Sequence, residues 1–274
     1  MSEAQATLLA GLRLRPAAGA PAFRIARTSY GPINPPERRI IHGIDVRTGE
    51  TRRTLSAPLS DWNRWDTIGR TFYLADSLEA AYAEALAPFR RRTGDGSDPL
   101  EADAAAIGLT LEEFIALVEA DCGECSFMRT GNLPASWRHA RAVYTLHMPT
   151  VGSWIDIGHG DTLAALDAAL GPQLSDLGYE NGLTVADVLS DDRQLTTRIA
   201  AALRGLVFAD GSEPLGIAYP SKRGYGTCWA YWMRRLDLGL ATGAHDPRPT
   251  RAVPITERDP TLVRVSGVYG IRVH

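Results

Sequence analysis

Two segments of this chain combine side chains whose types and spacing could support a chemical reaction. The first extends from Asn63 to Ser77 and continues to Glu84, and the second extends from Pro214 to Trp229. Together they offer a carboxylate, an arginine, a tyrosine and a serine that follows a proline. A carboxylate can stabilise positive charge that develops on a substrate, arginine can bind phosphate through two hydrogen bonds, and an aromatic ring can stack on a flat ligand. The two segments are therefore candidates for a functional site.

Each candidate residue also has an ordinary structural interpretation when it is considered alone. Glu84 lies off the apolar stripe of its expected helix, as solvated glutamates do. Arg24 and Arg64 are of a type that commonly forms surface ion pairs. Tyr73 in an apolar strand would belong to the core, and Ser221 after a proline would belong to a turn. Their occurrence together, in this order and with this local spacing, favours the functional interpretation.

The two segments resemble the signature regions of the RES domain, a family named for its arginine, glutamate and serine. The family's first region is a Gly-Arg-aromatic-Asn turn, a strand that ends in Tyr-Leu-Ala and a helix with an internal glutamate. Its second region is a Gly-Ile-x-Tyr-Pro-Ser run before a glycine-containing loop. The matching residues here are Asn63-Arg64-Trp65-Asp66, Tyr73-Leu74-Ala75, Glu84 and Gly216-Ile217-Ala218-Tyr219-Pro220-Ser221.

The resemblance extends from about residue 22 to about residue 232, with gaps. Weaker similarities lie at residues 23–25, at residues 154–157 and in the helix expected over residues 194–202. One departure is that Asp66 stands where the family has asparagine. The leading loop and residues 90–140 are also longer than a minimal RES domain requires.

The resemblance implies an ADP-ribosyltransferase-like fold, with split mixed and antiparallel sheets, flanking helices and a helical insertion. It also implies an enzyme that breaks the bond between nicotinamide and ribose in NAD. The enzyme would be a glycohydrolase if water accepts the ADP-ribose, and a phosphorylase if inorganic phosphate does. Members of the family commonly act as toxins that are paired with an antitoxin protein. NAD would be the substrate, and no metal would be required.

Cleavage of this bond develops oxocarbenium character on the ribose, as in glycoside hydrolysis. The nicotinamide departs as a neutral molecule, so strong acid catalysis is not needed. Glu84 is expected to stabilise the ribosyl cation, Tyr73 to stack on the nicotinamide, and Ser221 to orient the substrate through a hydrogen bond.

The diphosphate of NAD requires fixed cationic donors, for which arginine is well suited. Arg24 and Arg64 are expected to bind it, and Arg27 is a further candidate. Arg64 is expected to take part in both binding and catalysis, because it lies in the first signature region.

Two other functions use the same residues. The first is transfer of ADP-ribose to a protein or nucleic-acid target, for which the insertion at residues 90–140 could dock the acceptor. The second is a catalytically inactive module that binds a nucleotide or a partner protein, which the departure at Asp66 would favour.

Composition narrows the class of protein and its compartment. The chain has 274 residues, 45% of them hydrophobic and 22% charged, so it can bury a substantial core. Its formal net charge of −3 predicts no general attraction to nucleic acid or to an anionic membrane. Three cysteines indicate a reducing compartment, and no stretch is typical of a signal peptide or a membrane span. A cytoplasmic protein is expected.

Three further motifs have weaker functional interpretations. Gly158–Gly160 is similar to the start of a dinucleotide-binding loop, but a tight turn between strand and helix is preferred. Cys122 and Cys125 have the spacing of zinc ligands, but two more ligands would be needed. The basic and aromatic residues in 222–229 could stack on nucleic acid, but a pocket wall or core packing suits an acidic chain better.

The expected elements indicate an α+β fold, because short strands and helices do not alternate regularly. Residues 1–20 are expected to be loose, and residues 21–274 to form a single domain with an insertion at about 90–140. Residues 31–62 and 240–260 are expected to be loops, and residues 93–108 a linker. Strands are expected at 23–27, 71–75, 141–148, 154–157, 206–208, 215–219 and 263–273. Helices are expected from a cap at 76–77 to 89, from Thr110 to about 121, from a cap at Asp161 to 170, at 184–189 and at 194–203.

Overall fold

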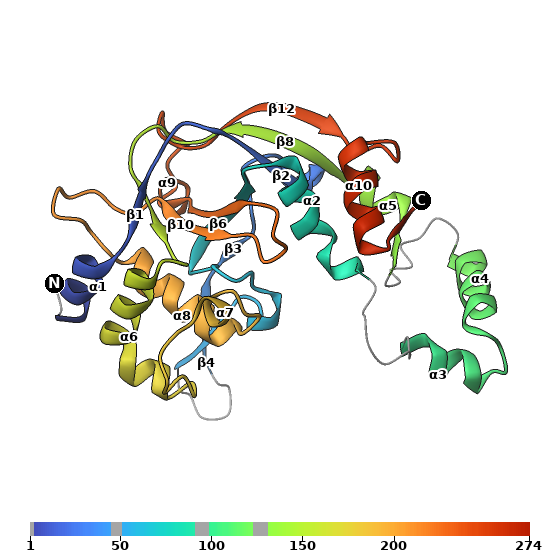
Figure 1. Cartoon of the computed structure of the whole chain (residues 1–274), viewed down its shortest axis with the longest axis horizontal. Helices are drawn as coiled ribbons and strands as arrows, with labels where there is room; N and C mark the ends of the chain where they lie inside the picture. Colours follow the sequence, from blue (N-terminus) through green and yellow to red (C-terminus); the bar gives the residue numbers. More distant parts are fainter. Residues whose placement is uncertain (1–2, 45–50, 91–98, 123–130) are drawn as a thin grey trace.

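A computed structural model describes residues 3–44, 51–90, 99–122 and 131–274 of the chain (Figure 1). This part contains thirteen strands and ten α-helices. They form one large mixed sheet of nine strands, two sheets of two strands, and helices that pack around them. The chain is therefore an α+β protein, as the pattern of elements predicts. None of the helices in these ranges is both long and apolar enough to cross a membrane.

The large sheet contains the strands β1 (Leu14–Pro16), β2 (Pro21–Arg27), β3 (Glu37–Arg38), β6 (Gly69–Ala75), β8 (Arg141–His147), β9 (Ser153–Asp156), β10 (Gly216–Pro220), β11 (Thr227–Trp232) and β12 (Arg248–Pro254). Its order is β1-β9-β10-β11-β6-β2-β8-β12, with β3 paired to β6 beside this path. The small sheets pair β4 (Ile40–Ile44) with β5 (Thr51–Leu55) and β7 (Asn132–Leu133) with β13 (Arg272–Val273).

The helices are α1 (Glu3–Gly11), α2 (Leu78–Leu86), α3 (Pro99–Ala106), α4 (Leu111–Cys122), α5 (Ala135–His139), α6 (Gly160–Ser175), α7 (Val185–Val188), α8 (Arg193–Arg204), α9 (Arg234–Asp237) and α10 (Pro260–Tyr269).

The large sheet consists of two halves that are joined at one residue pair. β2 and β6 pair only between Phe23 and Ala75, whereas β2 pairs with β8 along its whole length and β6 pairs with β11 from Thr71 onwards. The other end of β6 pairs with β3 instead. Figure 1 shows β8 and β12 arching away from β6 and β10. Strands that diverge after one pair leave a cleft between them, and the candidate site lies there.

A buried cluster packs between the two halves of the sheet. It takes side chains from one half and from the other, including Phe72, Trp154 and Tyr231 on one side and Tyr144 and Leu146 on the other. Burial of large aromatic and aliphatic side chains contributes about 1.5–3 kcal/mol each, so this cluster holds the halves together although they share one backbone pair.

Helices cover the outer face of each half. α1, α6 and α8 pack on β9, β10 and β6 through a cluster that contains Leu8, Leu166, Ile199 and Ile217. α2, α5 and α10 pack on β8 through a separate cluster, which contains Tyr82, Trp137, Val143 and Leu262. The fold is thus layered as helices, half-sheet, half-sheet and helices.

The N-terminal segment differs from the prediction of a loose chain. Residues 3–16 form α1 and β1, and β1 pairs with the edge strand β9. The Leu8 side chain is only 2% exposed, because α1 packs on α6. Arg15 forms an ion pair with Asp156 at 2.7 Å. The alanine-rich composition concealed a short helix with one large buried side chain.

Several loop predictions are also wrong. Residues 31–62 contain β3 and the hairpin of β4 and β5, and residues 240–260 contain β12, which pairs with β8. Residues 206–208 form no strand, because their backbone turns back from Phe208 to Ser212 after α8. β3 and β12 pair with strands that are far along the sequence, so local patterns do not report them.

The strand predicted at residues 263–273 is instead mostly helix α10. Asp259 caps it by accepting hydrogen bonds from Thr261 and Leu262, and Gly270 ends it in a left-handed conformation with a φ of 65°. Its buried residues Leu262, Val265, Ser266 and Tyr269 recur at the spacing of a helix face. The apparent alternation was misleading, whereas the cap, Pro260 and the glycine are the start and stop signals of a helix.

The insertion predicted at about residues 90–140 includes β7 and α5 as well as α3 and α4. α3 and α4 contact each other and lie to one side of the sheet in Figure 1. The capping box predicted at Thr110 and Glu113 is confirmed by reciprocal hydrogen bonds of 2.9 and 3.2 Å. The linker predicted at residues 93–108 is wrong where α3 forms. Cys125 and the side chain of Cys122 lie outside the residues that the structure describes.

The predicted helix over residues 161–170 is confirmed as α6, but its cap is different. The side chain of His159 accepts a hydrogen bond from the Asp161 amide at 3.2 Å, so His159 rather than Asp161 caps the helix. The preceding glycine-containing segment is a tight turn between β9 and α6.

Candidate active site

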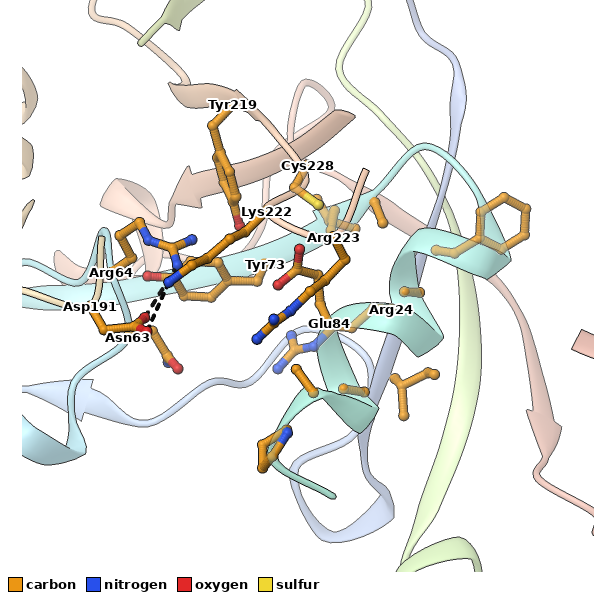
Figure 2. Close-up of a pocket in the computed structure, with 18 of the residues that line it drawn as sticks. Arg24, Asn63, Arg64, Tyr73, Glu84, Asp191, Tyr219, Lys222, Arg223 and Cys228 are labelled. Carbon is orange, nitrogen blue, oxygen red and sulfur yellow. Dashed lines mark hydrogen bonds and ion pairs between the residues drawn. The ribbon is translucent and has the colours of Figure 1, made fainter. Parts of the chain in front are cut away.

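A cavity of about 560 Å³ lies where β2 and β6 diverge. Its walls come from these two strands, from α2, from the end of β10 with the turn that follows it, and from the loop before α8. Figure 2 shows that the side chains which project into it come from segments that are far apart in the sequence. They include Arg24, Arg64, Tyr73 and Glu84, four of the residues that the sequence singled out.

Glu84 lines this cavity and is hydrogen-bonded to Ser221, which is buried and is not among the residues that line the cavity. The Ser221 hydroxyl donates a hydrogen bond of 2.7 Å to Oε1 of Glu84, across 137 positions of sequence. The Arg223 amide donates to the same hydroxyl oxygen at 3.1 Å. Ser221 was expected to orient the substrate, but its proton points at the carboxylate. Its direct effect is therefore to orient Glu84.

Local structure fixes both partners. α2 starts at Ser77, whose side chain accepts from the Ala80 amide at 3.1 Å, so Glu84 occupies a defined turn of a capped helix. Ser221 follows the last residue of β10, and its amide donates to the Gly226 carbonyl at 2.7 Å, which closes the turn to β11. The Ser77 hydroxyl also donates to the Tyr225 carbonyl at 3.3 Å and links the helix to this turn.

Tyr73 contributes an aromatic ring, and hydrogen bonds to its hydroxyl fix the position of that ring. The hydroxyl donates to Oδ1 of Asp66 at 2.8 Å and accepts from the Trp65 amide at 3.0 Å. Burial, together with the negative charge of Asp66, raises the pKa of Tyr73 well above its usual range. The phenol therefore stays protonated, and the ring is available as a fixed aromatic wall of the cavity.

Asp66, the departure from the RES pattern, holds the turn that carries Arg64. Its buried carboxylate accepts from the Tyr73 hydroxyl, from the Asn63 amide at 3.0 Å and from Nε of Arg38 at 3.0 Å. Arg38 comes from β3, which the sequence analysis treated as loop. An asparagine has one acceptor oxygen, so its amide donor would face either the Tyr73 hydroxyl or the Arg38 guanidinium, and the carboxylate is therefore suited to this arrangement.

Arg64 and Arg24 line the cavity but are held differently. Arg64 is buried and donates from Nε to the Ser190 carbonyl at 3.0 Å. Arg24 donates to the Pro32 carbonyl at 3.0 Å, and its guanidinium lies 4.5 Å from the centre of the Phe72 ring. Burial lowers the pKa of Arg24 to about 10, so it is still cationic at neutral pH.

Arg27, the third arginine expected to bind the diphosphate, lies apart from these. It is exposed at the end of β2, where it pairs in register with Arg141, and it is not among the residues that line the cavity.

Four charged residues that were not assigned to the site also line the cavity: Asp191, Arg193, Lys222 and Arg223. Asp191 accepts from Lys222 at 2.8 Å and lies 3.4 Å from Arg64 and from Arg193. Nε of Arg223 is buried and has no hydrogen-bond partner in the described part of the chain. Lys222 and Arg223 directly follow Tyr-Pro-Ser, and this position could have indicated that they belong to the site.

The cavity is strongly cationic although the chain is acidic. Among the residues described, five arginine or lysine side chains line it, against two carboxylates, Glu84 and Asp191. Cys228 also lines it, but burial and the nearby Glu84 raise the pKa of its thiol far above its usual range. Cys228 is therefore not a thiolate nucleophile, and the arrangement suits an anionic ligand next to one oriented carboxylate.

Comparisons with protein-family models, curated proteins and solved structures found no match to this chain.

Proposed function

We propose that this protein cleaves the bond between nicotinamide and ribose in NAD, and that it belongs to the RES family with an ADP-ribosyltransferase-like fold. The observation that carries the proposal is the hydrogen bond from Ser221 to Glu84, whose side chain lines a cationic cavity. The two residues come from the two segments that resemble the RES signatures, and they meet although they are far apart in sequence. The division of the sheet into two halves is consistent with the proposed fold.

In the proposed reaction, the bond between C1′ of the ribose and the nicotinamide nitrogen breaks, and its electron pair leaves with the neutral nicotinamide. The Glu84 carboxylate stabilises the positive charge that develops on the ribose. Tyr73 stacks on the nicotinamide, and the surrounding arginines bind the diphosphate. An oxygen of water or of inorganic phosphate then forms the new bond to C1′, and a water nucleophile loses its proton to solvent.

The first test is a time course of NAD, nicotinamide and ADP-ribose products with purified protein, with and without inorganic phosphate. Nicotinamide release that matches NAD loss is expected. Dependence on phosphate would identify a phosphorylase, and equal rates in both buffers would identify a glycohydrolase. In a lysate with labelled NAD, label that stays bound to macromolecules would show that the reaction is ADP-ribosyl transfer and not NAD degradation. Folded protein that releases no nicotinamide in either buffer would overturn the proposal.

Glu84→Gln should lower kcat/KM for NAD by about 100-fold or more, because the amide cannot supply the negative charge. The matched control is Glu79→Gln on the same helix. Glu79 forms an ion pair with Arg264 at 3.4 Å and does not line the cavity, so this variant should retain the rate of the unmodified protein. Equal rates for both variants would contradict the role of Glu84.

A further inference from the structure

One end of the cavity holds a carboxylate that three cations surround. Asp191, in the loop between α7 and α8, lies 2.8 Å from Lys222 and 3.4 Å from both Arg64 and Arg193. Its side chain is 69% exposed, whereas that of Arg64 is 10% exposed. Figure 2 shows Asp191 on one side of Tyr73 and Glu84 on the other.

The two arginines are positioned without Asp191. Nε of Arg64 donates to the Ser190 carbonyl at 3.0 Å, and Nε of Arg193 donates to the Trp62 carbonyl at 2.9 Å. Backbone carbonyls therefore hold both guanidinium groups, and each keeps further N–H donors for another acceptor. Asp191 is thus an added anion rather than the support of the cluster.

The charges around Asp191 do not balance. One carboxylate faces three cations, and two of its partners are arginines, whose planar groups match phosphate as well as carboxylate. A phosphate group offers more oxygens than a carboxylate. An exposed ion pair contributes little to the stability of the protein, so water can replace the contacts that Asp191 would lose.

We infer that Arg64, Arg193 and Lys222 form a subsite for a phosphate group of the ligand, and that Asp191 fills this subsite in the free protein. The inference rests on the proposed function for the identity of the ligand, a dinucleotide. Ligand binding displaces the Asp191 carboxylate, so Asp191 lowers the affinity for every ligand that carries a phosphate here. A ligand that also binds near Glu84 can offset this cost through its further contacts, whereas a simple phosphate cannot.

Asp191 retains its charge across the neutral range. The hydrogen bond from Lys222, aided by the charges of Lys222, Arg64 and Arg193, lowers its pKa below the usual value of an aspartate. The charge that Asp191 brings to this competition is therefore constant around neutral pH.

The test is calorimetric binding of ADP-ribose and of inorganic pyrophosphate at two NaCl concentrations. Asp191→Asn should bind both ligands more tightly, roughly threefold to tenfold, because three cations are then left without their carboxylate. Its affinity should also fall more steeply with salt. Lys222→Gln should weaken the binding of both ligands.

The control for the change in net charge is Asp161→Asn. Asp161 is 72% exposed, lies 3.4 Å from His159 and does not line the cavity, so the loss of its charge should leave binding unchanged. Binding by Asp191→Asn that is equal to or weaker than that of the unmodified protein, with circular dichroism showing a folded chain, would overturn the inference.

The two proposals fail in different ways. Absence of nicotinamide release would overturn the proposed function, while tighter anion binding by Asp191→Asn would still support the phosphate subsite. Nicotinamide release by the unmodified protein together with unchanged binding by Asp191→Asn would overturn only the subsite.

Discussion

At the scale of single residues, local contacts account for Asp66, which departs from the RES pattern that the sequence resembles. Its carboxylate joins the turn that carries Arg64, the hydroxyl of Tyr73 and the guanidinium of Arg38. All three contacts fix groups at or beside the cavity. The departure therefore does not by itself favour a module that has lost its site.

Asp66→Asn should lower the free energy of unfolding by about 1–3 kcal/mol, because Arg38 loses its ion-pair partner and the buried amide donor faces either Arg38 or the Tyr73 hydroxyl. Urea unfolding would measure the loss. Asp61→Asn, two residues from Asn63 and exposed, should change stability by less than about 0.5 kcal/mol. If Asp66→Asn were as stable as Asp61→Asn, the proposed role of the carboxylate would be wrong.

The candidate site could be predicted from sequence only where residue type and local order carry the information. Glu84, Tyr73 and Arg64 lie in one continuous segment, and Ser221 lies in a second. Asp191 could not be found in this way, because two of its three partners, Arg64 and Lys222, come from other segments. Its position depends on how α7 and α8 pack, and no local pattern encodes that packing.

At the scale of elements, local signals predicted those strands and helices whose ends are marked by caps or whose residues are continuously apolar. β6, α2 and β8 are examples. α10 was misassigned because a short alternation was given more weight than its cap and its terminal glycine. β3 and β12 were missed because strands depend on partners that are distant in sequence.

Gly267→Ala tests the helical assignment of α10. Gly267 is exposed within the helix, and a Cβ placed there would meet no heavy atom within 4 Å. Alanine should therefore raise the free energy of unfolding by about 0.5–1 kcal/mol, because glycine loses more backbone entropy in a helix. Thermal unfolding would show a higher midpoint. A lower midpoint would instead agree with a glycine that forms a bulge in a strand.

At the scale of the whole molecule, the N-terminal residues belong to the folded body. α1 packs on α6, and β1 covers the edge of the sheet beside β9. Covering an edge strand removes a row of unpaired backbone groups that could pair with another chain. The N-terminal segment therefore contributes both stability and protection of the sheet.

Leu8→Ala should reduce the free energy of unfolding by about 2–4 kcal/mol, because the side chain is buried between α1 and α6. Chemical denaturation would measure it. Leu14→Ala is the comparison, since Leu14 is 36% exposed and its truncation should have a much smaller effect. Equal small effects at both positions would mean that the segment is loose, as its composition suggested.

The position of β6 in the sheet has a consequence for the order of events during synthesis. β6 lies between β2, which is synthesised earlier, and β11, which is synthesised later. Ser221 is synthesised 137 residues after Glu84. At roughly 5–20 residues per second, this interval lasts about 7–27 s on the ribosome. A nascent chain passes through this period with β6 lacking its β11 partner and Glu84 lacking its serine. The contact between Ser221 and Glu84 therefore forms late in synthesis.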